Sequence, residues 1–146
     1  MSKIKAAVCH QFTAPLQIET VELRSHLLNE IEVKLGAVAI CHSDIAFAEG
    51  LWGGVLPAVY GHEAAGVVAK VGASVNGISI GDHVVVTLIR ACGHCVSCAA
   101  GQPTSCETPQ DASASPLKDQ RGQILQQGMA CGAFAEKVVV NASQVV

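Results

Sequence analysis

The chain has 146 residues, of which 50% are apolar and 14% are charged, and its formal net charge is −3. A chain of this length fits one domain with a hydrophobic core of its own. It contains no apolar run of about 20 residues, so we expect no membrane-spanning helix. Its Lys and Arg residues are scattered, which excludes a basic surface for nucleic acid or anionic lipid and leaves small molecules or proteins as partners.

Short apolar runs rich in Val and Ile dominate the chain and predict a mostly β domain; they cover residues 4–9, 16–23, 31–40, 64–71, 83–89 and 134–140. We expect the glycines at 66, 72, 77 and 81 to lie at bends between strands of a tightly curved, barrel-like sheet. Residues 42–49 predict one short helix, with Ile45, Phe47 and Ala48 toward the core. The stretch 108–128 is rich in Ser, Pro and Gln and predicts a long surface loop.

A nucleotide-binding Rossmann unit is not expected in this chain. No Gly-x-Gly-x-x-Gly sequence occurs, and strands do not alternate with long helices. The chain starts with a strand pattern rather than an apolar signal segment, which predicts a soluble, cytoplasmic protein.

The seven cysteines indicate metal binding rather than disulfides, because the predicted compartment is reducing and four of them lie within residues 92–106. Two Cys-x-x-Cys steps and a later cysteine suit a closed tetrahedral zinc site formed by Cys92, Cys95, Cys98 and Cys106. An iron–sulfur cluster is the alternative, but the bacterial ferredoxin pattern places Pro after its fourth cysteine, where this chain has Glu107. His94 could replace a thiolate, although we expect it to be solvated.

A second group of metal-binding residue types lies earlier in the chain, in Cys41-His42-Ser43-Asp44 and Gly61-His62-Glu63. A catalytic zinc needs three protein ligands and an open fourth position, and the third ligand is not evident here. Placed before a helix, Cys41 would lie near the positive end of the helix dipole, which favours the thiolate. Alternatively, Cys41 is a small buried residue and His62 a core histidine.

The run 61–66, Gly-His-Glu-Ala-Ala-Gly, followed after five residues by Gly-Ala-Ser-Val at 72–75, resembles the zinc signature of medium-chain alcohol dehydrogenases. The resemblance continues through Gly-Asp-His-Val at 81–84, the cysteine loop and Gly-Ala-Phe-Ala-Glu at 132–136, and covers the whole chain. It implies a GroES-like, partly open β-barrel with short helices and a four-cysteine zinc loop.

The same resemblance implies roles for individual residues. Cys41 and His62 would bind a catalytic Zn²⁺, and the four loop cysteines a structural Zn²⁺. Ser43 would receive the proton of the bound alcohol, Asp44 would orient His62, and Glu63 would lie behind the zinc.

Three further positions match more weakly. His42 matches a basic residue that faces the cofactor pyrophosphate, and Trp52 and Leu88 match residues that line the substrate cleft. Trp52 could equally be core packing, and His42 could be exposed. Cys9 and Cys131 match no ligand position and are expected to be small buried residues.

The resemblance also has departures. In the family, a third catalytic ligand and an NAD- or NADP-binding domain would lie beyond residue 146, so this chain would be one part of an enzyme. A family histidine that passes protons outward is replaced here by Ala46. The implied activity is oxidation of an alcohol to an aldehyde or ketone by an enzyme that is a homo-oligomer at full length. The alternatives are a polyol or glutathione-adduct dehydrogenase, or a non-enzymatic zinc-stabilised binding module.

Overall fold

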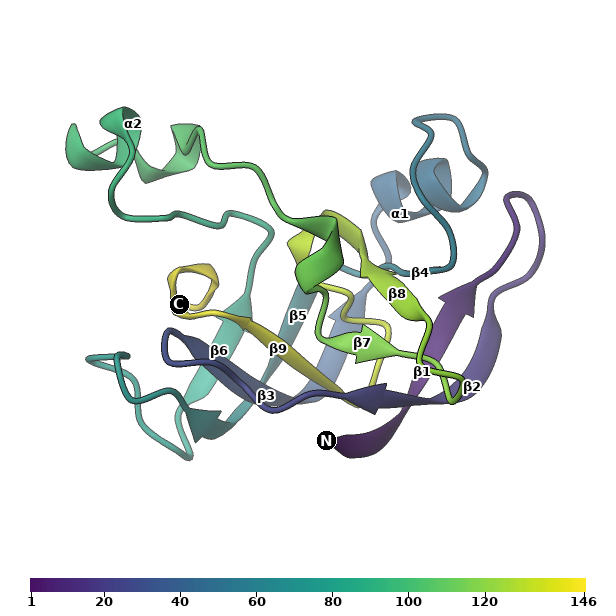
Figure 1. Cartoon of the computed structure of the whole chain (residues 1–146), viewed down its shortest axis with the longest axis horizontal. Helices are drawn as coiled ribbons and strands as arrows, with labels where there is room; N and C mark the ends of the chain where they lie inside the picture. The colour runs from purple at the N-terminus through teal and green to yellow at the C-terminus, as the bar shows by residue number, and fades with distance from the viewer.

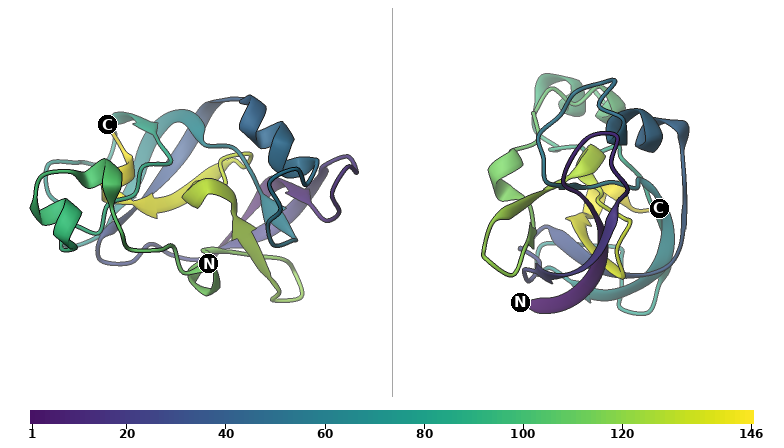
Figure 2. Two further views of the ribbon diagram at one scale, coloured as in Figure 1. Left: turned by 90° about the horizontal axis from the view of Figure 1, so that it is seen from above. Right: turned by 90° about the vertical axis from the view of Figure 1, so that its right-hand side faces the viewer.

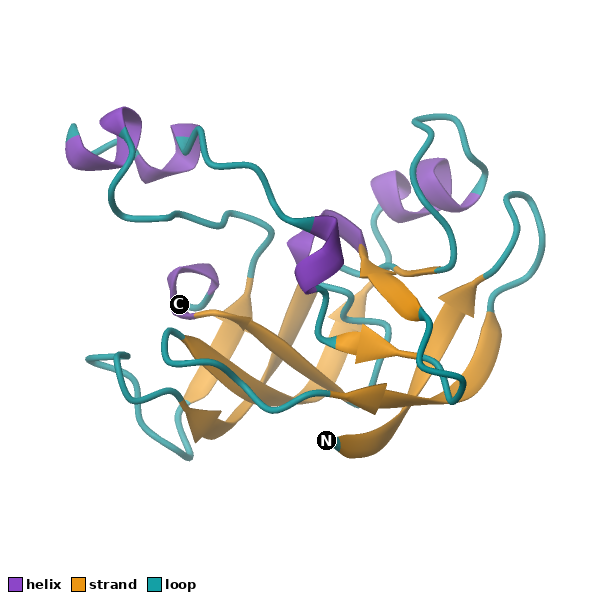
Figure 3. Ribbon diagram, viewed as in Figure 1, coloured by secondary structure: helices purple, strands orange, loops and turns teal.

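The computed structural model describes residues 1–146 as two β-sheets joined by short helical segments (Figures 1 and 3). The first sheet closes into a barrel whose strands follow the order β1 (Ser2–Cys9), β2 (Gln17–Leu23), β7 (Leu117–Lys118), β8 (Ile124–Gln127) and β4 (Ala58–Val59). The second sheet is open and follows the order β6 (His83–Val86), β5 (Glu63–Val71), β3 (Glu30–Ala39) and β9 (Lys137–Asn141). The predicted mostly β fold with a barrel is therefore confirmed.

The helical segments are short and lie outside the sheets. They are α1 (His42–Ala48), α2 (Val96–Ala99) and the 3₁₀ turns η1 (Pro103–Ser105), η2 (Ala112–Ala114), η3 (Gly128–Ala130) and η4 (Ala142–Gln144). Figures 1 and 2 show α1 and α2 toward opposite ends of the molecule, with α2 on a lobe that projects from the body. None of these helices has the length and apolarity needed to cross a membrane.

Strand β9 separates two hydrophobic cores. Val138 and Val140 pack with Ile31 and the open sheet, whereas Val139 points the other way and packs in the barrel core. This alternation follows from the two-residue period of a strand, in which successive side chains point to opposite faces. β9 therefore contributes buried valines to both halves of the molecule.

The pairing of β3 with β5 brings together the segments that carry the second candidate metal site. The strands are antiparallel and end with Ala39 opposite Glu63. The register shifts between Glu32 and Val33 and again between Leu35 and Ala37. Because the chain continues from Ala39 to Cys41 and enters β5 from His62, the two segments leave adjoining strand ends.

The prediction of a long loop over 108–128 was wrong in its second half. β7 and β8 lie within it, pair with each other, and connect β2 to β4 to close the barrel. Leu117 and Leu125 are 2% and 0% exposed and anchor these strands in the barrel core. Strands of two and four residues are too short to show a periodic pattern among polar neighbours.

Three smaller expectations also need correction. Gly66 lies inside β5 rather than at a bend, and a Cβ there would come within 2.3 Å of the Lys34 carbonyl oxygen, so close strand approach requires glycine. Ile45 of α1 is 43% exposed, and Asp44 and Ala46 are the buried residues of that helix. β6 ends at Val86, three residues before the predicted end.

Glu32 forms a buried ion-pair triad that joins three strands of the open sheet. Its carboxylate is 1% exposed and lies 2.7 Å from Lys70 Nζ and 3.0 Å from Lys137 Nζ. Burial alone would raise the pKa of Glu32, but the hydrogen bonds and charges of Lys70 and Lys137 outweigh it and lower the pKa. The folded protein therefore holds this carboxylate ionised at a pH where the unfolded chain begins to protonate it.

We expect this triad to make the fold acid-sensitive. Because the folded pKa of Glu32 lies below the unfolded value of about 4.3, its stabilisation is complete above that pH and is lost as the pH falls through the folded value. Glu32→Gln should flatten the loss of unfolding free energy between about pH 5 and about pH 3 in urea titrations. The control Glu49→Gln, at an exposed carboxylate, should keep the wild-type slope, and an unchanged slope in Glu32→Gln would contradict the assignment.

Candidate metal centres

The four-cysteine loop folds around its own sulfur atoms. Cys95 caps the N-terminus of α2, Cys98 lies within that helix, and Cys106 ends η1. All four Sγ atoms lie within 4.8 Å of one another, and those of Cys92 and Cys98 are 4.0 Å apart. A zinc tetrahedron with Zn–S bonds of about 2.3 Å separates its sulfurs by about 3.8 Å. The four thiols thus have the chemistry and spacing of a structural zinc site.

Backbone amides direct their hydrogens toward these sulfurs. The Sγ of Cys92 accepts from the amides of His94 at 3.4 Å and Cys95 at 3.2 Å. The hydrogen bond from the Thr108 side chain, followed by that from the His94 amide, lowers the pKa of Cys92 to about 5. The amide of Cys92 likewise lowers the pKa of Cys106. These contacts favour the thiolate form, which is the form that binds metal.

The pKa of Cys98 shifts in the opposite direction to those of Cys92 and Cys106. The Gly93 amide would lower the pKa of Cys98, but desolvation and hydrogen bonds within the cysteine cluster raise it to about 11.

His94 is exposed, and its Nδ1 lies 2.9 Å from the Cys92 carbonyl oxygen rather than in the sulfur cluster. All seven cysteines are free, as expected for ligands or buried thiols rather than disulfides, and Cys9 and Cys131 are buried.

The second centre depends on the buried carboxylate of Asp44, which is 2% exposed. Its Oδ2 accepts from the amide of Cys41 at 3.0 Å and completes the cap of α1. Its Oδ1 accepts from the amide of Gly61 at 2.9 Å and lies 3.2 Å from Nδ1 of His62. One carboxylate therefore fixes the start of α1 and the entry to β5 relative to each other.

This arrangement leaves the other imidazole nitrogen of His62 available. Its Nε2 lies 3.4 Å from the hydroxyl of Ser43 and 3.7 Å from Oε1 of Glu63. Ligand atoms of Cys41, His62 and Glu63 all lie within 4.8 Å of one another. A thiol, an imidazole and a carboxylate are the donor types that zinc accepts, so these residues fit a metal with a position left open.

An apolar groove of about 440 Å³ opens beside this centre. His62 and Glu63 line it together with Val38, Thr87 and Leu88. Leu88, which the resemblance assigned to a substrate cleft, lines this groove, and so does Thr87, which the sequence did not single out. No motif marks Thr87, which lies inside the predicted run 83–89, and no signal in the sequence singles it out.

Trp52 and His42 do not line this groove. Trp52 is 61% exposed and packs edge-on against Phe47, with ring centroids 5.2 Å apart. His42 is exposed at the first position of α1. The structure therefore brings together Cys41, Ser43, Asp44, His62, Glu63 and Leu88, and places the other two outside the groove.

Comparison with known proteins agrees with this architecture. Residues 28–146 match the alcohol dehydrogenase GroES-like domain family. The chain is 38% identical over 146 residues to an alcohol dehydrogenase of Moraxella sp., covering 97% of this chain and 39% of that protein. It is 42% identical over 115 residues to an alcohol dehydrogenase of Geobacillus stearothermophilus, covering 77% of this chain and 34% of that protein.

The structural comparison leads to the same family. A crystal structure of an alcohol dehydrogenase zinc-binding domain protein from Burkholderia ambifaria superposes with a TM-score of 0.91 at 34% identity, covering 99% of this chain and 41% of that one. The chain thus spans about two fifths of the length of the proteins it matches. By sequence and by fold, the chain belongs to the alcohol dehydrogenase family and carries its GroES-like domain.

Proposed function

We propose that this chain forms the metal-binding catalytic part of a zinc-dependent dehydrogenase that oxidises an alcohol to an aldehyde or ketone with NAD or NADP. The observation that carries the proposal is the convergence of Cys41, His62 and Glu63 within 4.8 Å beside an apolar groove. The alcohol dehydrogenases among its relatives support the reaction class. The nucleotide-binding part of such an enzyme is not found in this fold.

Each residue of the centre has a role in this proposal. When bound, zinc supplies a Lewis acid for the substrate oxygen, and the nicotinamide supplies the hydride acceptor. Cys41 and His62 hold the metal, and Asp44 keeps the Nε2 of His62 directed at it through the contact to Nδ1. Ser43, 3.4 Å from that Nε2, would accept the proton of the substrate hydroxyl while its own hydroxyl proton passes on to water. Glu63 balances the charge at the edge of the centre.

The groove supports an apolar alcohol as substrate. Eight of its 11 lining residues are hydrophobic, with Val38, Leu88 and several alanines among them. Such a surface offers few hydrogen-bonding partners to a polyol or to the charged groups of a glutathione adduct. Among the family activities, the chain therefore favours oxidation of aliphatic or aromatic alcohols. A substrate profile that favoured charged adducts would reject this choice.

The proposal predicts two zinc ions per chain. Cys41→Ala and His62→Ala should each reduce the zinc measured by plasma mass spectrometry from about two equivalents to about one, because the four-cysteine site stays intact. In an enzyme that joins this domain to its nucleotide-binding domain, alcohol-dependent NADH formation should fall by about a thousandfold or more.

A matched control separates ligand loss from a general effect of histidine removal. His83→Ala, at an exposed histidine of β6, should keep both zinc ions and full turnover. Retained turnover in Cys41→Ala would reject the catalytic assignment. Zinc at two sites with no turnover in the two-domain enzyme would instead favour a zinc-stabilised binding module.

A further inference from the structure

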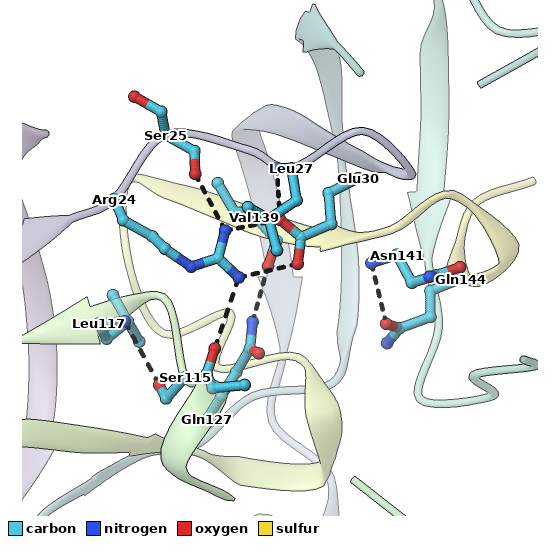
Figure 4. Close-up of polar contacts among 11 residues, drawn as sticks. Arg24, Ser25, Leu27, Glu30, Ser115, Leu117, Gln127, Val139, Asn141 and Gln144 are labelled. Carbon is cyan, nitrogen blue, oxygen red and sulfur yellow. Dashed lines mark hydrogen bonds and ion pairs between the residues drawn. The ribbon is translucent and has the colours of Figure 1, made fainter. Parts of the chain in front are cut away.

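A polar cavity of about 240 Å³ lies apart from both metal centres. It is lined by the connection from β2 to β3, by Arg90 before the cysteine loop, by residues 110–116 around η2, by the end of β8 with η3, and by residues 139–144 of β9 and η4. Figure 4 shows part of its wall, with the Arg24–Glu30 pair on one side and Asn141 and Gln144 on the other. Five separate chain segments thus contribute polar side chains to one small enclosure.

The carboxylates of this cavity already have partners. Both oxygens of Glu30 accept from the Arg24 guanidinium, at 2.6 and 2.8 Å, and Oε2 also accepts from the Leu27 amide. Asp111 Oδ1 accepts from the amide and the hydroxyl of Ser113, at 2.9 and 2.7 Å. Both Glu30 oxygens and Asp111 Oδ1 therefore have donors within the protein, whereas Asp111 Oδ2 has none.

Two carboxamides are engaged as donors as well. Gln127 Nε2 donates to the carbonyl oxygens of Cys131 and Val139, each at 2.9 Å. Gln144 Nε2 donates to the carbonyl oxygens of Thr87 and Ala130, each at 3.0 Å. These contacts fix the wall of the cavity and use up the side-chain N–H groups of Gln127 and Gln144 on the backbone.

Several side-chain donors of the cavity have no partner in the protein. Arg90 lines it, is half-buried, and has no ion pair or hydrogen bond anywhere in the structure. The side-chain amides of Asn29 and Gln110 also lack partners, and the Asn141 side chain uses only its oxygen, which accepts from the Ser143 amide. An arginine fork with nearby amide donors matches an oxyanion, and the one carboxylate oxygen of the cavity without a partner, Asp111 Oδ2, belongs to an exposed residue.

We propose that this cavity binds a small oxyanion, a phosphate or carboxylate group, through the guanidinium of Arg90 and the side-chain amides of Asn29 and Asn141. The Arg24–Glu30 pair closes one side and is not itself the binding group, because its charges cancel. Arg90 also lies between Leu88 of the groove and Cys92 of the cysteine loop, so an anion held there would fasten the segment joining the two metal centres. The site does not depend on the proposed dehydrogenase activity.

The test is an NMR titration of the zinc-loaded chain with sulfate, phosphate and acetate in separate arms at constant ionic strength. We expect saturable shifts of the Arg90 Nε–Hε signal and of the Asn29 and Asn141 side-chain amides. Response to sulfate and phosphate alone identifies a phosphate-type site, and an equal response to acetate identifies a carboxylate site. Sulfate is included beside phosphate because it competes only weakly with the protein ligands for the bound zinc.

Variants locate the binding group. Arg90→Gln should weaken binding by about tenfold or more, as for loss of a charge-assisted hydrogen bond. Asn29→Asp, which adds a negative charge to the same wall, should weaken it in a protein that keeps Arg90. The control Arg121→Gln, at an exposed arginine with the same charge change, should bind as the wild type does. Shifts that do not saturate, or equal weakening in Arg121→Gln, would overturn the proposal.

Discussion

Replacing Cys98 by serine should abolish zinc binding at the four-cysteine loop and leave residues 92–106 without a fixed structure. The physical reason is that this lobe has no hydrophobic core: neither α2 nor η1 contains a buried residue, and Val96 is 78% exposed. The four thiols are the one feature that converges on its centre. Metal binding therefore supplies most of the free energy that orders the loop.

The measurement combines zinc content with amide hydrogen exchange. Cys98→Ser should bind one equivalent of zinc fewer, and the amides of the loop should exchange at nearly unprotected rates while the two sheets stay protected. The control Ser97→Ala changes the neighbouring residue, whose hydroxyl contacts Glu107 on the same lobe, and should keep the metal. A protected loop in Cys98→Ser would show that packing, not metal, holds the lobe.

Asp44→Ala should destabilise the fold by about 3 kcal/mol or more, because it leaves buried donors without a partner at about 1–3 kcal/mol each. The amides of Cys41 and Gly61 and the Nδ1 of His62 all depend on this carboxylate. The same change frees the imidazole to rotate, so zinc affinity at the second centre should fall by about tenfold to a hundredfold.

Urea unfolding and a competitive zinc titration measure the two effects separately. Asp82→Ala is the matched control, because that exposed carboxylate accepts one hydrogen bond, from the Ser79 amide, and lies outside the centre. Asp82→Ala should lower the free energy of unfolding by about 1 kcal/mol or less and leave zinc affinity unchanged. Equal destabilisation by the two substitutions would show that Asp44 has no special place in the fold.

The sequence predicted those parts of the fold in which a pattern is long enough to be seen. The strands that became β1, β2, β3 and β5 have seven or more residues each, and the predicted runs lie within about two residues of them. β7 and β8 were missed because two and four residues between polar segments give no period, and their pairing depends on contacts distant in sequence. The burial of Leu117 and Leu125 is thus a tertiary property.

The candidate site was predictable in its residue types but not in its connections. The spacing of the loop cysteines indicated their shared centre, and the resemblance paired Cys41 with His62. Nothing local indicates that Asp44 also accepts from the Gly61 amide, because this contact forms only when α1 lies beside the start of β5. The contact of Asp44 with the Cys41 amide, by contrast, is the local cap of α1. Trp52 lies outside the groove because it packs on Phe47, five residues earlier in the chain.

The paired strands β3 and β5 set how far apart the ligands of the second centre can lie. Ala39 faces Glu63. Cys41 lies two residues after Ala39, and His62 directly precedes Glu63. Removing one paired residue such as Val38 would move Cys41 by one strand step of about 3.3 Å and turn its side chain to the opposite face. Length variation among relatives should therefore be found in the turns of this domain and be excluded from the stretch between Gly36 and Cys41.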